Sequence, residues 1–302
     1  MADVKRCGHR LPALPAAIAV VLVAGCPYLS GLAPCVADVW RGIEYADRPG
    51  ADGPLTSLDV YSPRNAEGAP VVIYVHGGSW RTGDKRRVRF KPTAFAAEGY
   101  VFVSINYRLS PAVQHPAHVE DVAAAIVWIH EHVAEFGGDP DALFLLGHSA
   151  GAHLVALVAT DERYLAGEGA SLDVVKGVVG LDAGAYDIPL LMAMGEPGTL
   201  TRIWLAFGSD PAVLEDASPT AHVEADKGIP PFLLVHAGPR LASAVQAETF
   251  RDLLLDADVP AVTYHAVGMT HQTLNERIGM PGDATTVRIL EFLEALQGAA
   301  AP

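Results

Sequence analysis

One serine of this chain stands in a pattern that is typical of a catalytic nucleophile. The segment Gly147-His-Ser-Ala-Gly151 fits G-x-S-x-G, with Ser149 at its centre. An apolar run over Leu143–Leu146 precedes it, and a helical pattern of small residues over Ala150–Thr160 follows it. A strand, a sharp turn and a helix in this order present the serine hydroxyl for attack on a carbonyl carbon. We therefore predict that Ser149 is a nucleophile; the alternative is a Gly/Ser-rich turn without chemistry.

A serine hydroxyl needs a base that takes its proton, and the chain contains 12 histidines as candidates. His271 follows a strand pattern over Val262–Val267, in a loop-like segment before the last helix, and it is the best candidate. Six others fall in helical or strand patterns or next to the serine, where we expect surface, packing or pocket-wall roles: His130, His132, His148, His153, His236 and His265.

The elements that must position these residues alternate between strand and helix along the chain. This alternation predicts an α/β fold with a mostly parallel, doubly wound sheet. The strand patterns cover Val39–Tyr45, Leu58–Tyr61, Val71–Val75, Val101–Asn106, Leu143–Leu146, Val174–Leu181, Phe232–His236 and Val262–Val267. The helical patterns cover Arg87–Glu98, Val119–Phe136, Ala150–Thr160, Gln246–Asp256 and Asp283–Leu296.

Six short motifs follow one another along the chain: His76-Gly-Gly-Ser-Trp80, Asn106-Tyr-Arg-Leu109, Gly137-Gly-Asp-Pro140, Gly147-His-Ser-Ala-Gly151, Asp216-Ala-Ser-Pro219 and Pro230-Pro231. With these motifs in the family's order, the chain from about residue 39 to the end resembles α/β-hydrolases of the esterase and lipase branch. The H-G-G-x-W form is similar to carboxylesterases and kynurenine formamidases. The resemblance implies the α/β-hydrolase fold and a serine hydrolase that cleaves small carboxylic esters through an acyl-enzyme, without a cofactor or a metal.

The resemblance also assigns an oxyanion hole, the set of backbone N–H groups that stabilises the negative oxygen of the reaction intermediate. It implies that Gly78 and Ser79 donate from the loop after the Val71–Val75 strand, and that Ala150 donates from the residue after the nucleophile. The simpler interpretation of His76-Gly-Gly is an ordinary turn. The resemblance further implies that His271 is the general base, because the family's base occupies this place.

The carboxylate that should orient the histidine is where the chain departs from the family pattern. The family carries Asp or Glu just after the strand that matches Phe232–His236. Here the segment Ala237–Ala244 contains no carboxylate, and Pro239 and Arg240 occupy the expected place. The loss of such an acid lowers turnover by about 10⁴-fold in a serine protease.

Three alternatives remain for the acid. Asp187 or Asp182, which follow the strand over Val174–Leu181, could supply it, and we take Asp187 as the first candidate although its turn is structural in the family. Glu248 could reach from the next helix. Otherwise Ser149 and His271 form a dyad of low turnover. We expect the chosen carboxylate within about 2.6–3.2 Å of a ring nitrogen of His271.

The segment Ile188–Phe207 contains several large apolar residues and is expected to form a small cap. The sequence contains no pattern for a long lid, which favours small acyl esters.

Two other functions remain open. An aryl or kynurenine formamidase would use the same machinery on an N-formyl bond. The other function is that of a catalytically impaired binding protein, which the missing acid suggests.

The basic run Lys85–Arg89 is interpreted as a solvated helix face.

Charge and cysteine content exclude several classes of function. The net charge of −14 argues against nucleic-acid binding. All three cysteines, Cys7, Cys26 and Cys35, lie in the first 35 residues, so the remainder has no disulfide framework and no zinc spacing. No nucleic-acid partner is expected, and the resemblance to esterases implies a small-molecule ester as the partner.

The N-terminal segment has the pattern of an export signal. A basic start precedes an apolar run over Leu11–Ala24, which is short for a membrane span. The run ends in Leu22–Cys26, which resembles a bacterial lipobox with Cys26 as the acylated residue, although Pro27 departs from the pattern. Cleavage near Ala37 and an uncleaved anchor are alternatives. We predict a signal or anchor segment over residues 1–37, a hydrolase domain over 38–302, and a periplasmic or membrane-anchored lipoprotein; a cytoplasmic protein is the alternative.

Overall fold

The structure is a computed structural model that describes residues 37–48, 53–195, 198–238 and 241–299. The export signal, the lipobox and Cys26 lie outside the described residues, as do Pro239 and Arg240. Ala37, the alternative cleavage point, is the first residue of a strand. In the part of the chain that the structure describes, no helix is long and apolar enough to cross a membrane.

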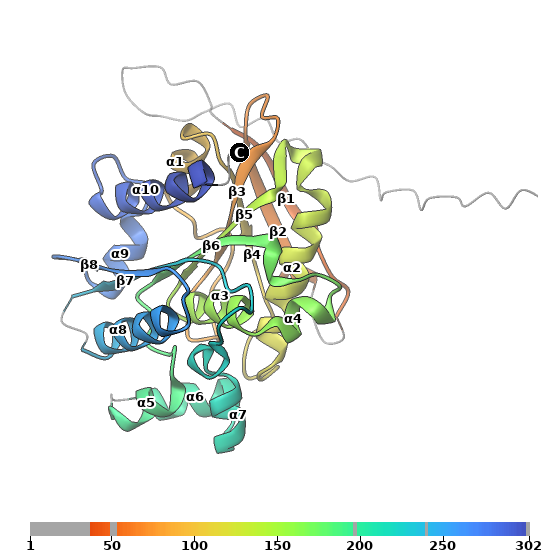
Figure 1. Ribbon diagram of the computed structural model, residues 1–302. Helices are drawn as coiled ribbons and strands as arrows, with labels where there is room; N and C mark the ends of the chain where they lie inside the picture. Colours follow the sequence, from red (N-terminus) through yellow and green to blue (C-terminus); the bar gives the residue numbers. More distant parts are fainter. Residues whose placement is uncertain (1–36, 49–52, 196–197, 239–240, 300–302) are drawn as a thin grey trace, which may run out of the picture.

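One eight-stranded sheet forms the centre of the described structure, in the order β1-β2-β4-β3-β5-β6-β7-β8 (Figure 1). Strands β1 and β2 pair antiparallel, as do β2 and β4, and all later neighbours are parallel. The strands are β1 Ala37–Glu44, β2 Ser57–Pro63, β3 Ala69–Val75, β4 Val101–Ile105, β5 Gly138–His148, β6 Val175–Leu181, β7 Phe232–Ala237 and β8 Ala261–Ala266.

Helices cover both faces of this sheet (Figure 1). They are α1 Lys91–Ala97, α2 Ala117–His132, α3 Ala150–Thr160, α4 Glu162–Gly167, α5 Ile188–Ala193, α6 Thr199–Phe207, α7 Pro211–Asp216, α8 Leu241–Asp256, α9 His271–Arg277 and α10 Ala284–Ala299. The predicted α/β-hydrolase architecture, a mostly parallel sheet wound with helices, is confirmed.

The continuous apolar runs become strands that are buried on both faces. Along β3, Val71, Ile73 and Val75 belong to the core beneath α2, α3 and α8, whereas Val72 and Tyr74 belong to the core beneath α1 and α10. Alternate side chains of a strand point to opposite faces, so a strand between two helical layers must be apolar at every position. Because every position of such a strand is apolar, the sequence pattern does not show which side chains face which helical layer.

The parallel strands all end at the same edge of the sheet, and the loops at this edge carry the predicted chemistry. The loop after β3 contains Gly77–Trp80, the turn after β5 is Ser149, and Asp182 follows β6. The segment after β8 leads into α9, which begins at His271. Ligand sites of open α/β sheets form at this edge, outside the carboxyl ends of the strands.

The basic run Lys85–Arg89 is not the solvated helix face that the sequence suggested. Helix α1 begins only at Lys91, and the Lys85 side chain is buried. Its Nζ lies 2.5 Å from a carboxylate oxygen of Asp59 on β2. A buried ammonium group needs such a partner, because burial without one costs several kcal/mol. That interpretation was therefore wrong for Lys85.

Candidate active site

Ser149 occupies the strained turn that the motif predicts. Its backbone angles are φ 55° and ψ −117°, a region that non-glycine residues rarely adopt and that costs about 1–3 kcal/mol. Hydrogen bonds on both sides hold this conformation. The Ser149 N–H donates to the carbonyl of Leu181 at the end of β6 (2.8 Å), and its carbonyl accepts from the N–H of His153 in α3 (3.1 Å).

The two motif glycines are required because β5, α3 and the end of β3 approach closely. A Cβ atom on Gly147 would lie 2.4 Å from the carbonyl oxygen of Gly151. A Cβ atom on Gly151 would lie 2.1 Å from the carbonyl oxygen of Val75. These contacts are shorter than any real Cβ contact, so neither position accepts a side chain without moving the backbone.

The His-Gly-Gly loop lies against the nucleophile. A Cβ atom on Gly77 would come within 2.9 Å of the Ser149 Cβ. The next three residues all have positive φ, with 128° at Gly78, 54° at Ser79 and 58° at Trp80. Such a run of left-handed backbone lifts the peptide N–H groups of the loop out of the usual strand ladder, as a donor loop requires. A tight turn is present, since the Arg81 N–H donates to the Gly78 carbonyl (3.1 Å), but positive φ at two successive non-glycine residues, Ser79 and Trp80, is uncommon in an ordinary turn.

The predicted oxyanion donors have distinct places in this arrangement. Ser79 and Ala150 line the same cavity as Ser149, and Ala150 is the first residue of α3. The first N–H groups of a helix have no partner within the helix, and they carry the positive end of its dipole. Gly78 is not among the residues that line the cavity; its carbonyl accepts from Thr82 N–H and so holds the turn.

His271 forms a direct contact with a buried carboxylate, and this carboxylate belongs to Asp182. The Nδ1 atom of His271 lies 2.5 Å from an Asp182 carboxylate oxygen. The other oxygen of Asp182 accepts from the Ala237 N–H at the end of β7 (2.9 Å) and from the Ser243 hydroxyl of α8. Burial opposes ionisation of Asp182, but the hydrogen bonds from His271, Ser243 and Ala237 together hold its pKa well below the usual range.

Asp187, the first candidate for the acid, has a different role, and this expectation is corrected. Its carboxylate accepts the Leu190 N–H (2.8 Å) and caps α5. Asp182 comes directly after β6, so its side chain can extend past the end of the neighbouring β7. Five residues later the chain has already turned into the cap. Glu248, the third candidate, is exposed on α8.

The positive φ of Asp182, 51°, helps to aim this carboxylate. Asp tolerates left-handed backbone better than most residues do. The side chain thus reaches, from the β6 end, the neighbourhood of β7 in which the family pattern keeps its acid. Asp182 was one of the two strand-end candidates.

A buried histidine supports the backbone of His271. His148, the last residue of β5, donates from Nε2 to the carbonyl oxygen of His271 (3.0 Å), and the two rings lie 4.6 Å apart. Burial and the nearby charge of His271 lower the pKa of His148 to about 3, so this ring stays neutral at physiological pH. The packing role that we expected for His148 is therefore a specific one.

Helix α9, which carries His271, is fixed at two further points. Thr270 and Thr273 form a reciprocal capping box at its start. At its centre, the side chain of Asn275 accepts the Tyr74 hydroxyl (2.9 Å) and its carbonyl accepts the Lys91 ammonium (2.6 Å). Burial, and to a smaller extent the charge of Arg89, lowers the pKa of Lys91 to about 7.

Ser149 and His271 open onto one cavity of about 330 Å³. The expected cap is present, since α5 and α6 contribute residues to the wall of this cavity. It is less apolar than we predicted, because Arg202 contributes to it. The lining residues are Ser79, Trp80, Ser149, Ala150, Gly184, Ala185, Leu191, Thr199, Arg202, Ile203 and His271. Arg202 was not among the site residues predicted above, although it is the single cation of the apolar segment Ile188–Phe207.

Two similar proteins carry names of ester hydrolases. The probable carboxylic ester hydrolase LipM of Mycobacterium tuberculosis is 32% identical over 235 residues, which cover 74% of this chain and 54% of LipM. The isoprenylcysteine alpha-carbonyl methylesterase ICME of Arabidopsis thaliana is 29% identical, covering 78% of this chain and 57% of that protein. This chain thus spans little more than half the length of these relatives.

Two further comparisons concern the fold and the family. The crystal structure of esterase B from Lactobacillus rhamnosis superposes with a TM-score of 0.73 at 22% identity, covering 87% of each chain. It shows the fold alone. The sequence model of the BD-FAE family matches residues 58–250, a stretch that contains the glycine loop, Ser149 and Asp182. The chain belongs to the BD-FAE family of α/β-hydrolases.

Proposed function

We propose that this chain is a serine hydrolase that cleaves small carboxylic esters through an acyl-enzyme on Ser149. The observation that carries the proposal is the contact between His271 and Asp182 at the cavity onto which the strained Ser149 opens. The names of the relatives, carboxylic ester hydrolase and methylesterase, support esters as the substrate class.

The first half of the reaction follows from these positions. The Ser149 hydroxyl attacks the ester carbonyl while Nε2 of His271 takes its proton. Asp182 accepts a hydrogen bond from Nδ1 and stabilises the imidazolium that forms. The N–H groups of Ser79 and Ala150, which both line the cavity, stabilise the oxyanion. His271 then returns the proton to the leaving alcohol.

The second half repeats this chemistry with water. A water molecule gives a proton to His271 and attacks the acyl-enzyme. The intermediate collapses, the carboxylic acid leaves, and the proton returns to the Ser149 oxygen. A cavity of about 330 Å³ suits a short acyl group and a small alcohol.

Both alternatives that the sequence left open lose support. The impaired binding protein was suggested by the missing acid, and Asp182 supplies a carboxylate to His271. A formamidase would use the same machinery, but the relatives named above carry names of ester hydrolases.

The test is covalent labelling of Ser149 combined with turnover. We expect a fluorophosphonate probe to label the wild type at Ser149, and we expect hydrolysis of p-nitrophenyl butyrate to exceed that of N-formylkynurenine. Ser149→Ala should abolish labelling and ester hydrolysis while the circular dichroism spectrum stays unchanged. Substantial ester hydrolysis by the alanine variant would contradict the proposal, and faster turnover of the formyl substrate would favour the formamidase.

We propose in addition that residues 1–37 direct export and that Cys26 is lipidated. The basic start, the apolar run and the Leu22–Cys26 pattern support this proposal. Mass spectrometry of protein from a bacterial host should find an acylated N-terminus at Cys26 in the membrane fraction. Soluble protein that still begins at Met1 or Ala2 would rule it out, and so would a Cys26→Ala variant that fractionates with the membrane as the wild type does.

A further inference from the structure

One cation stands in the wall of the active-site cavity. Arg202 lies on α6, is partly buried, and lines the same cavity as Ser149 and His271. One of its guanidinium nitrogens donates to the Thr199 hydroxyl at 2.9 Å. A hydroxyl group orients the guanidinium but leaves its charge uncompensated.

Arg202 differs in this respect from comparable arginines of the chain. Among the described residues, the other arginines that are not fully exposed form ion pairs with carboxylates: Arg48, Arg108, Arg251 and Arg288. Arg202 forms no ion pair with any carboxylate in the part of the chain that the structure describes. A partly buried charge without a partner loses hydration energy. The presence of such a charge in the wall of a substrate cavity therefore points to a ligand of opposite charge that pairs with the guanidinium.

The neighbours of Arg202 define what this ligand is. Leu191 and Ile203 provide apolar surface in the same wall, and Thr199 adds a hydroxyl donor beside the guanidinium. A planar guanidinium matches a carboxylate through two parallel hydrogen bonds. The cavity therefore combines a reactive serine, an apolar wall and a carboxylate receptor within about 330 Å³.

We propose that Arg202 binds the carboxylate of an anionic ester, so that the preferred substrates are small esters with a free carboxylate. This inference rests on the proposed function. The carboxylate can belong to the acyl side, as in a half-ester of a short dicarboxylic acid, or to the alcohol side, as in an acylated hydroxy acid. The net charge of −14 repels anions at long range, so local recognition is what such a substrate requires.

The experiment compares each anionic ester with a neutral isostere. Monoethyl succinate and ethyl succinamate test the acyl side, and O-acetyl glycolate and its amide test the alcohol side. In the wild type, we expect kcat/KM for the carboxylate to exceed that for the amide by about tenfold or more in one of the two pairs. In Arg202→Gln this ratio should fall by about tenfold, mainly through KM, because the contact already exists in the ground state.

Two control variants separate recognition from general damage. Arg202→Lys keeps the positive charge but cannot form the two parallel hydrogen bonds of a guanidinium, so it should retain only part of the preference. Arg64→Gln removes the same charge from an exposed turn between β2 and β3, at the opposite edge of the sheet, and should leave the ratio unchanged. A fall of equal size in Arg64→Gln would indicate a long-range field and would overturn the proposal.

Failure of this inference is distinguishable from failure of the proposed function. If neither carboxylate ester is preferred by the wild type, or if the ratio is unchanged in Arg202→Gln, Arg202 does not bind the substrate. Those outcomes leave ester hydrolysis intact. If Ser149→Ala still hydrolyses both members of a pair, the assignment of the nucleophile is wrong instead.

Discussion

Two of the histidine–aspartate contacts among the described residues have opposite arrangements. In the active site, the His271 side chain is 34% exposed and Asp182 is fully buried, with 2.5 Å between them. In the second contact, the His115 side chain is only 4% exposed and the Asp216 side chain is 42% exposed, with 3.6 Å between them. In the first pair the histidine is the more exposed partner and the carboxylate is buried, whereas in the second the carboxylate is the more exposed partner.

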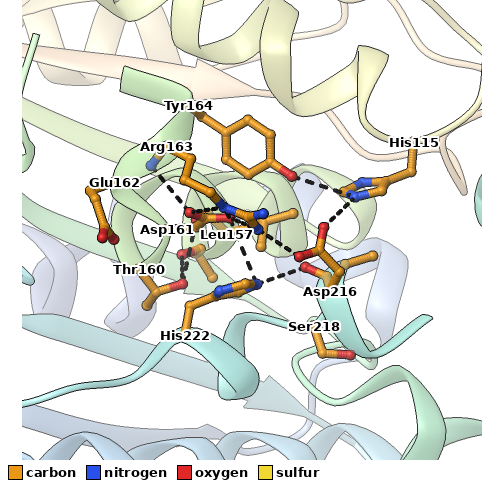
Figure 2. Close-up of polar contacts among 12 residues, drawn as sticks. His115, Leu157, Thr160, Asp161, Glu162, Arg163, Tyr164, Asp216, Ser218 and His222 are labelled. Carbon is orange, nitrogen blue, oxygen red and sulfur yellow. Dashed lines mark hydrogen bonds and ion pairs between the residues drawn. The ribbon is translucent and has the colours of Figure 1, made fainter. Parts of the chain in front are cut away.

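The surroundings of the second pair explain its arrangement (Figure 2). Arg163 of α4 lies between Asp161 and Asp216 and pairs with both carboxylates at 2.6 Å. Burial lowers the pKa of His115, so this ring stays neutral beside a carboxylate that Arg163 already neutralises. The cluster therefore joins α4 to the end of α7 and serves the packing of the cap.

The comparison teaches which features separate a reactive histidine from a structural one. Proximity to a carboxylate is common to both pairs. Only in the active site is the carboxylate held by several hydrogen bonds while the histidine faces a cavity that also contains a serine. A reactive histidine must exchange protons with a substrate, so its carboxylate can be buried but the ring cannot.

The strongest test of this distinction is the loss of the buried carboxylate. Asp182→Asn should lower kcat by about 10⁴-fold, because an amide neither selects the correct tautomer of His271 nor stabilises its charged form. Asp187→Asn is the matched control and should remain close to wild type, since Asn caps a helix as well as Asp does. Steady-state kinetics on p-nitrophenyl butyrate measures both. A large loss in Asp187→Asn with a small one in Asp182→Asn would reverse the assignment.

The next test weakens the support of Asp182 rather than removing it. Ser243→Ala deletes one hydrogen bond to a carboxylate oxygen and should lower kcat by about tenfold, with little change in KM. The control is Ser104→Ala, which removes a buried hydroxyl that donates to the Lys85 carbonyl on the β4 side of the sheet. This control should lose stability but keep its kcat. Equal effects of the two variants on kcat would show that Ser243 acts only through stability.

A mutation near the His115–Asp216 pair should lower stability but leave activity unchanged. Arg163→Gln removes the bridge between Asp161 and Asp216 and should lower the free energy of unfolding by about 1 kcal/mol, since the arginine is largely exposed. We expect kcat/KM to change by less than about twofold, because the cluster contacts no catalytic residue. Urea unfolding and ester kinetics on the same preparation provide the two values. A loss of activity without a loss of stability would place this cluster in the reaction.

The last test concerns the lysine beneath α9. Burial lowers the pKa of Lys91 from 10.5 to about 7, so between these pH values the unfolded chain binds more protons than the folded one. The free energy of unfolding should therefore rise with pH in this window, and Lys91→Met should flatten the rise. Urea midpoints at about pH 7 and pH 9.5 measure the slope.

Lys176→Met is the control for this effect, because Lys176 is exposed on β6. It should keep the slope of the wild type. If Lys91→Met also keeps it, Lys91 releases its proton at an ordinary pH despite its burial.

The sequence by itself determined the fold and predicted most of the candidate site. The Ser149 elbow and the His76–Trp80 loop are local motifs, in which neighbouring residues create the strained backbone and the close approach that the chemistry needs. Alternating strand and helix patterns determined the sheet for the same reason, since each pattern reports the burial of its own segment. His271 was identified by its place after a strand. None of these inferences needs a distance between residues far apart in the chain.

Only the tertiary structure decided which carboxylate meets His271. Asp182 and Asp187 are two aspartates that lie five residues apart after the same strand. Asp182 follows β6 directly and extends past the end of β7, whereas Asp187 caps α5. The uncompensated charge of Arg202 and the burial of Lys85 were decided in the same way. All three features depend on which groups from distant segments come within a few ångströms of one another. Strand pairing and helix packing set these distances, so composition and local sequence pattern do not encode them.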